Sequence, residues 1–134
     1  MKKIITLFAI LALFAGISFA EGNVSKEKIK LAEKGYNFAL SSDNAGVRNS
    51  ALYQIAVLKA RVPEINANGY KKMLDKVINN ESEKPYIRVN AKMTLVILNN
   101  ELPAEKLDNA EKDQDPNVFF NNIYEQLTDL YAAR

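Results

Sequence analysis

Carboxylates, Lys, Ser and Tyr are the side chains left for catalysis in this sequence, because the chain contains no Cys and no His. That absence removes the usual zinc and copper ligand sets, together with Ser–His and Cys–His catalysis. Two close pairs remain, Glu81 with Glu83 and Asp113 with Asp115. Paired carboxylates cleave glycosidic bonds when one of them stays protonated in an apolar pocket. A small carboxylate-based hydrolase of envelope carbohydrate is therefore the enzyme class that composition leaves open.

Both carboxylate pairs lie in hydrophilic turns just before expected helices. An acid at that position caps the helix and complements its dipole. The segment from Asp113 to Asn117 is superficially similar to a calcium loop, but the Gly and the distant bidentate Glu of an EF-hand are missing. We therefore expect capping roles for these acids, with no catalytic residue, no metal site and no cofactor.

The N-terminal segment has the composition of a secretory signal peptide. A basic start is followed by an uncharged apolar stretch from Ile4 to Ile17, with small residues at Ser18 and Ala20. The apolar stretch is shorter than the ~20 residues that span a bilayer. We expect cleavage after Ala20, so that residues 21–134 are exported to the bacterial periplasm or secreted, with no stable membrane insertion. An uncleaved membrane anchor is the alternative.

Charge is balanced in the mature chain but unevenly placed. Lys2 and Lys3 account for the formal net charge of +2 of the whole sequence. Nucleic acid is disfavoured as a partner, because counterion release requires a basic surface. Residues 21–98 carry a net charge of +5 and residues 99–134 one of −5. This asymmetry either orients a partner or is neutralised within the fold.

The mature chain is predicted to be all-helical, since no stretch alternates apolar and polar residues over more than a few positions. Six helices are expected, over residues 24–40, 45–61, 69–80, 85–99, 102–112 and from 116 onward. Ser25, Asp43 or Asn44, and Asp115 are the expected N-caps. In the first helix, Leu31 is expected to widen the apolar side, and Phe38 with it.

The second and fourth of these helices share one pattern. Five positions match in register, Val47, Arg48, Ala51, Ile55 and Leu58 with Ile87, Arg88, Ala91, Leu95 and Leu98. The last helix repeats the apolar spacing at Phe119, Ile123, Leu127 and Leu130, and its opposite face is polar, as expected of an end piece. Related helices that alternate with packing helices are typical of a helical solenoid.

The two matched segments resemble HEAT-like repeats, including their short bacterial form. The first reads D-x-x-x-V-R-x-x-A-x-x-x-I-x-x-L from Asp43 to Leu58, and the second P-x-I-R-x-x-A-x-x-x-L-x-x-L from Pro85 to Leu98. The D-x-D-P-x-V from Asp113 to Val118 is similar to the turn before such a helix. The resemblance implies a short right-handed α-solenoid, as one domain over residues 21–134, that binds a protein or peptide.

The resemblance also implies a structural role for two arginines. In the family, an Arg at the positions of Arg48 and Arg88 bonds to an acidic turn residue and ties repeats together. Asp43 and Glu83 are the nearest acidic turn residues. A plain small helical bundle is an alternative fold, and the Gly35-Tyr36 pair leaves a tetratricopeptide-like one open.

A second apolar face on the matched helices is the candidate binding site. Tyr53 and Val57 on one helix, with Met93 and Ile97 on the other, are either covered by flanking helices as core or exposed as a groove. A groove with Tyr and Met suits a partner helix or peptide. We expect an exported binding or scaffolding module without catalysis, the alternatives being the hydrolase above or a self-associating structural component of the envelope.

Overall fold

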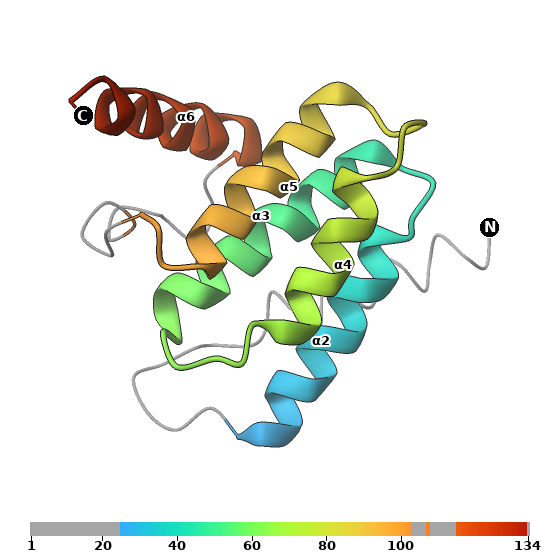
Figure 1. Ribbon diagram of the computed structural model, residues 1–134. Coiled ribbons are helices and arrows are strands. Elements are labelled where there is room, and N and C mark those ends of the chain that lie inside the picture. Colours follow the sequence, from blue (N-terminus) through green and yellow to red (C-terminus); the bar gives the residue numbers. More distant parts are fainter. Residues whose placement is uncertain (1–24, 103–106, 108–114, 134) are drawn as a thin grey trace.

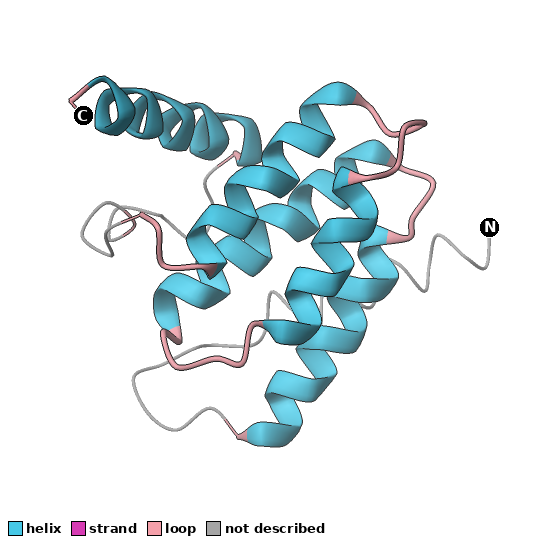
Figure 2. Cartoon of the chain, in the orientation of Figure 1, coloured by secondary structure: helices cyan, strands magenta, loops and turns pink. Residues whose placement is uncertain are grey.

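The computed structural model describes residues 25–102, 107 and 115–133 (Figure 1). The expected signal peptide, and most of the helix expected over residues 102–112, lie outside these residues. The described helices are α2 (Lys26–Leu40), α3 (Ala45–Arg61), α4 (Asn68–Ile78), α5 (Pro85–Leu98) and α6 (Pro116–Ala132). No strand occurs in the described part of the chain, as Figure 2 shows, so the all-helical prediction is confirmed there. Within the same residues, no helix has both the length and the apolar character that a membrane span requires.

Three helices begin where side chains bind free backbone N–H groups. The Ser25 hydroxyl accepts from the N–H of Lys28 at 3.3 Å, and the Asn44 side chain accepts from Gly46 at 2.8 Å. The Asp115 carboxylate accepts from the N–H of Asn117 at 2.7 Å. These bonds satisfy donors that have no partner within the helix. The expected caps are confirmed, and Asn44 rather than Asp43 is the one before α3.

The end of α5 depends on an asparagine in the left-handed region. Asn100 has a φ of 58°, the only positive φ outside glycine in the described residues. The N–H of Glu101 then donates to the carbonyl of Val96 at 3.1 Å. Asparagine tolerates this conformation better than most residues, which explains why an Asn pair follows this helix.

Helix α3 is the centre of the fold. It packs against α2, α5 and α6 (Figure 1). Nine of its residues are buried, on more than one side of the helix, and Leu52 and Ala56 are completely inaccessible. A helix that is apolar on two faces must lie between neighbours, and α3 does so.

Helix α4 packs against α5 and α2 through one apolar face. Its buried residues are Tyr70, Leu74 and Val77. The helix ends at Ile78, two residues before the predicted end. A ring contact joins it to α2, with the centroids of Tyr36 and Tyr70 6.2 Å apart.

Helix α6 buries side chains only in its first half, and Leu127 in its second half packs at the edge of the core. Phe119, Phe120 and Ile123 are its buried residues, and they face α3 and α5. Leu127 and Leu130, expected in the core, are only half-buried. The predicted end piece therefore covers the body as far as Leu127, and the end of the helix extends beyond it (Figure 1).

The apolar side of α2 is narrower than the sequence predicts. The helix buries Ala32, Gly35, Tyr36 and Leu40. Leu31 is 57% exposed and Phe38 50% exposed, so the prediction that they widen the packed side is wrong. Both side chains lie on the flank of α2 next to the buried stripe. Neither α3 nor α4 covers that flank.

Candidate functional site

The predicted groove residues belong to the core. Tyr53, Val57, Met93 and Ile97 are 2%, 5%, 6% and 1% exposed. The ring of Tyr53 packs edge-on against that of Phe119, with centroids 5.1 Å apart. Helix α6 therefore covers the side of α3 on which an open groove would lie. In this structure the four side chains fill the interior. Of the two possibilities that the sequence leaves open, core or groove, the structure has the core.

The repeat tie is formed by Arg48 and Glu83. The guanidinium Nε and Nη2 of Arg48 donate to the two carboxylate oxygens of Glu83 at 2.7 and 2.6 Å. The third donor, Nη1, binds the carbonyl oxygen of Ser42 at 2.8 Å. Arg48 thus joins the turn before α3 to the turn before α5. The hydrogen bonds from Arg48 hold the pKa of the Glu83 carboxyl below its ordinary value.

Arg88 has a different partner from the one expected. Its Nε donates to the carbonyl oxygen of Ile78, the last residue of α4, at 2.8 Å. Asp43 is exposed and pairs with neither arginine, because the only ion pair in the described residues joins Arg48 and Glu83. Even so, both arginines bind a carbonyl near the preceding helix, Arg48 that of Ser42 in the turn after α2 and Arg88 that of Ile78 at the end of α4.

A chain of hydrogen-bonded side chains, which we call the amide track, links three helices. The sequence did not predict it. The Asn90 amide donates to the side-chain oxygen of Asn49 at 2.7 Å, and the Asn49 amide donates to that of Asn117 at 3.1 Å. The Thr94 hydroxyl donates to the Asn90 carbonyl at 2.9 Å. These bonds join α5, α3 and α6 and satisfy polar groups that would otherwise be costly to bury. The signal in the sequence that could have indicated these contacts is the polar residue Asn49 on an otherwise apolar helix.

The candidate catalytic carboxylates have structural surroundings. A general acid needs a raised pKa, whereas that of Glu83 is lowered by Arg48. Its neighbour Glu81 is exposed. Asp115 caps α6, and Asp113 lies outside the described residues. No group of three or more His, Cys, Asp or Glu in the described ranges could hold a metal ion.

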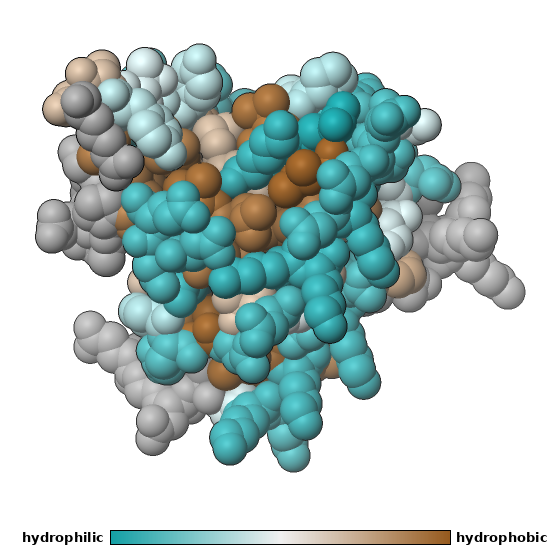
Figure 3. Space-filling model, in the orientation of Figure 1, coloured by the Kyte–Doolittle hydropathy of each residue, from teal (hydrophilic) through white to brown (hydrophobic). Residues whose placement is uncertain are grey.

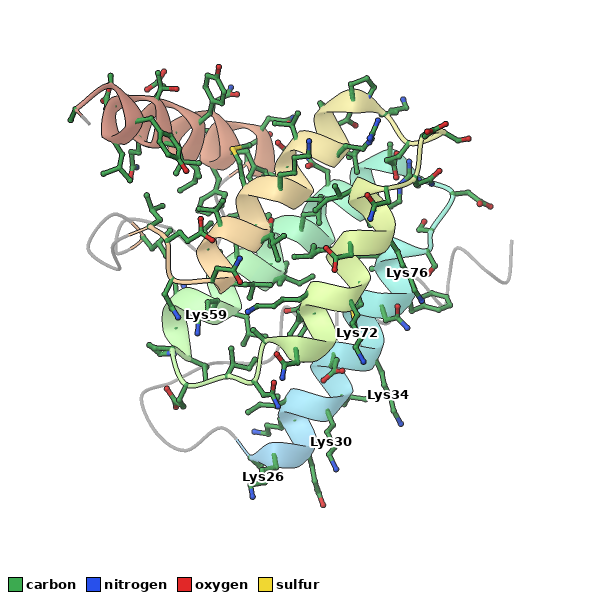
Figure 4. All side chains as sticks on the ribbon, viewed as in Figure 1. Lys26, Lys30, Lys34, Lys59, Lys72 and Lys76 are labelled. Carbon is green, nitrogen blue, oxygen red and sulfur yellow. The ribbon has the colours of Figure 1, made fainter. Side chains whose placement is uncertain are left out.

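Lysines form an exposed basic surface across α2 and α4. We call this surface the lysine face, formed by Lys26, Lys30, Lys34, Lys72 and Lys76. All five are exposed, and Figure 4 shows them along one side of the two packed helices. The residues on each helix are spaced four apart, which puts them on one side. Figure 3 shows the same side covered by hydrophilic side chains.

Two apolar side chains border the lysine face on α2. Leu31 and Phe38 are seven residues apart and therefore lie on nearly the same line along the helix. Acidic side chains also lie near this surface. Glu27 complements the dipole in the first turn of α2, Glu33 lies beside Gly69 at the start of α4, and Asp75 is exposed on α4. Lys59 is not part of the lysine face, because it is buried and donates to the carbonyl of Pro63. The surface thus combines several positive charges with two apolar contacts.

Comparison with protein-family models, with curated proteins and with solved structures finds no match for the chain. Function is therefore inferred from the residues of the chain itself. The Arg48–Glu83 tie and the amide track hold helices together, and their polar atoms are engaged. The lysine face with Leu31 and Phe38 is exposed, and it is the surface best suited to contact a partner.

Proposed function

We propose that this chain is an exported, HEAT-like repeat protein that binds an acidic protein surface in the bacterial cell envelope and catalyses no reaction. The signal-peptide-like N-terminus supports export. The matched contacts of Arg48 and Arg88 at helix ends support the repeat architecture.

The lysine face carries the proposal. Five ammonium groups on two packed helices attract an acidic surface and orient it before contact. Leu31 and Phe38 add apolar area, with exposed fractions of 57% and 50%. Affinity between proteins depends on a few such apolar anchors, while the surrounding charges set the rate and the specificity of association.

A protein partner fits the charge distribution better than a nucleic acid or a bilayer. The mature chain is neutral, with −5 over residues 99–134. An extended anionic polymer or membrane would meet this acidic part as well as the lysine face. A compact acidic patch can approach the lysine face alone, because salt screens charges beyond about 8–10 Å.

The test is a pull-down from envelope extracts with wild type and a Lys30→Glu, Lys34→Glu variant. The matched control is Lys28→Glu, Lys92→Glu, which makes the same change in net charge. Lys28 lies about 160° round α2 from Lys30, and Lys92 is exposed on α5. We expect the control to recover the same proteins as wild type and the lysine-face variant to lose one or more of them.

The salt dependence of recovery provides a second readout. Proteins held by the lysine face should be released as the salt concentration is raised, because exposed charges are screened. Equal recovery by all three proteins, with circular dichroism showing that each is folded, would mean that the lysine face is not the binding surface.

A further inference from the structure

The second half of α6 is mostly exposed, although Leu127 still packs at the edge of the core. Beyond Ile123 no residue of the helix is buried, although Leu127 and Leu130 continue the apolar spacing of Phe119 and Ile123. Tyr124 is 60% exposed. A partner that covered this half of the helix would therefore bury apolar surface and stabilise the helix.

The projecting half of α6 is purely acidic. The helix contains no Lys and no Arg. Glu125 and Asp129, one turn apart, are both exposed. They lie on the side of the helix away from Leu127 and Leu130, and the nearest exposed ring is that of Tyr124, which precedes Glu125. A partner for this side of the helix therefore needs positive charge and an apolar contact for Tyr124.

The lysine face has these properties. Lys30 and Lys34 have the same four-residue spacing as Glu125 and Asp129, so an acidic and a basic pair of matching length face the solvent on two helices. Leu31 and Phe38 lie beside the basic pair, as Tyr124 lies on the exposed part of α6. The two surfaces of one chain are thus complementary in charge, and both offer apolar contacts.

The two surfaces do not neutralise each other within one molecule. Helix α6 packs on α3 and α5, whereas α2 packs on α3 and α4. Figures 1 and 4 show α6 and the labelled lysines of α2 on different sides of the body. The only ion pair in the described part of the chain, Arg48 with Glu83, involves neither surface.

We infer that the projecting half of α6 in one copy docks on the lysine face of a second copy. This inference rests on the proposed function, since it names a second copy of this chain as a protein that the lysine face binds. Contact of α6 with α6 would place Glu125 and Asp129 of the two copies beside each other, and contact of two lysine faces would do the same with Lys30 and Lys34. The head-to-tail contact pairs opposite charges, and such a contact continues into a ring or an open filament.

The test is sedimentation of the purified chain over a range of concentrations, using charge reversals on each surface. The basic-to-acidic variant is Lys30→Glu, Lys34→Glu, and the acidic-to-basic variant is Glu125→Lys, Asp129→Lys. Wild type is expected to associate as concentration rises. Each single-surface variant should have an association constant at least about tenfold lower, because like charges then meet. The Lys28→Glu, Lys92→Glu control should associate like wild type.

The combined variant with all four reversals is the decisive sample. It again presents opposite charges at the contact, so association should return to the wild-type level, and an equimolar mixture of the two single-surface variants should also associate. A monomeric wild type, or a combined variant that stays dissociated, overturns the inference. If the pull-down still depends on Lys30 and Lys34 in that case, the proposed function stands with a different partner.

Discussion

Arg48 on α3 holds Glu83, thirty-five positions further along the chain, through two hydrogen bonds of 2.7 and 2.6 Å. Their side chains are 14% and 5% exposed, so the pair is largely shielded from solvent. A bidentate contact of this kind fixes orientation as well as distance. The turn before α3 and the turn before α5 are therefore held together by one side chain, which also binds the carbonyl of Ser42.

Removal of Arg48 should leave the buried Glu83 carboxylate without its partner. We expect Arg48→Ala to lower the free energy of unfolding by about 3 kcal/mol, measured by urea denaturation. Arg88→Ala, which loses one hydrogen bond to the Ile78 carbonyl, should cost about 1 kcal/mol. Equal costs for the two variants would show that the ion pair adds nothing beyond the shared carbonyl contact.

The contribution of Glu83 should depend on pH. Its pKa in the folded protein lies below the ordinary value of 4.5, chiefly because Arg48 donates hydrogen bonds to it. The stabilisation is therefore complete above pH 4.5 and is lost as the pH falls through the lowered folded pKa. We expect Glu83→Gln to be clearly less stable than wild type at pH 7 and to approach wild type as the pH is lowered below 4.5. A stability difference that stayed constant over that range would contradict the assigned pKa shift.

Tyr53 should behave as a core residue. Tyr53→Ala removes a ring that is 2% exposed and packs on Phe119, and we expect a loss of about 3–5 kcal/mol in unfolding free energy. Tyr124→Ala is the matched control, since that ring is 60% exposed, and its effect should stay within about 0.5 kcal/mol. Thermal or urea unfolding followed by circular dichroism measures both. A Tyr53→Ala protein as stable as wild type would contradict the assignment of Tyr53 to the core.

Tyr70 should tolerate the loss of its hydroxyl. The side chain is 1% exposed, and its hydroxyl has no hydrogen-bond partner among the described residues. A buried polar atom without a partner costs about 1–3 kcal/mol. Tyr70→Phe keeps the ring contact with Tyr36 and should raise the unfolding free energy by about 1 kcal/mol. A loss of stability would reveal a partner for the hydroxyl.

Local signals in the sequence predict most of the helices. Ser25, Asn44 and Asp115 cap helices because each bonds to an N–H two or three positions later, a contact that needs no distant residue. The two-sided apolar pattern of residues 45–61 likewise requires neighbours on both sides. These parts follow from the sequence, because their causes lie within one helix.

The contacts between helices could not be derived in the same way. Whether Tyr53 is core or surface depends on Phe119, which belongs to a helix far along the chain. A helical wheel gives the positions of side chains round α2 but not how much of α2 is covered by α3 and α4. The exposure of Leu31 and Phe38 therefore does not follow from the sequence. The choice of Glu83 over Asp43 by Arg48 depends on the relative placement of two turns, which the spacing of residues leaves open.

The most direct test of the proposed binding surface is photocrosslinking in the producing cells. A photoreactive residue placed at Leu31 or Phe38, which border the lysine face, should form a covalent adduct with a protein. Mass spectrometry then identifies that protein as a second copy of this chain or as a different protein. The same residue placed at Lys92 on α5 should form no such adduct. Adducts at position 92 with none at 31 or 38 would contradict the assignment of the lysine face as the binding surface.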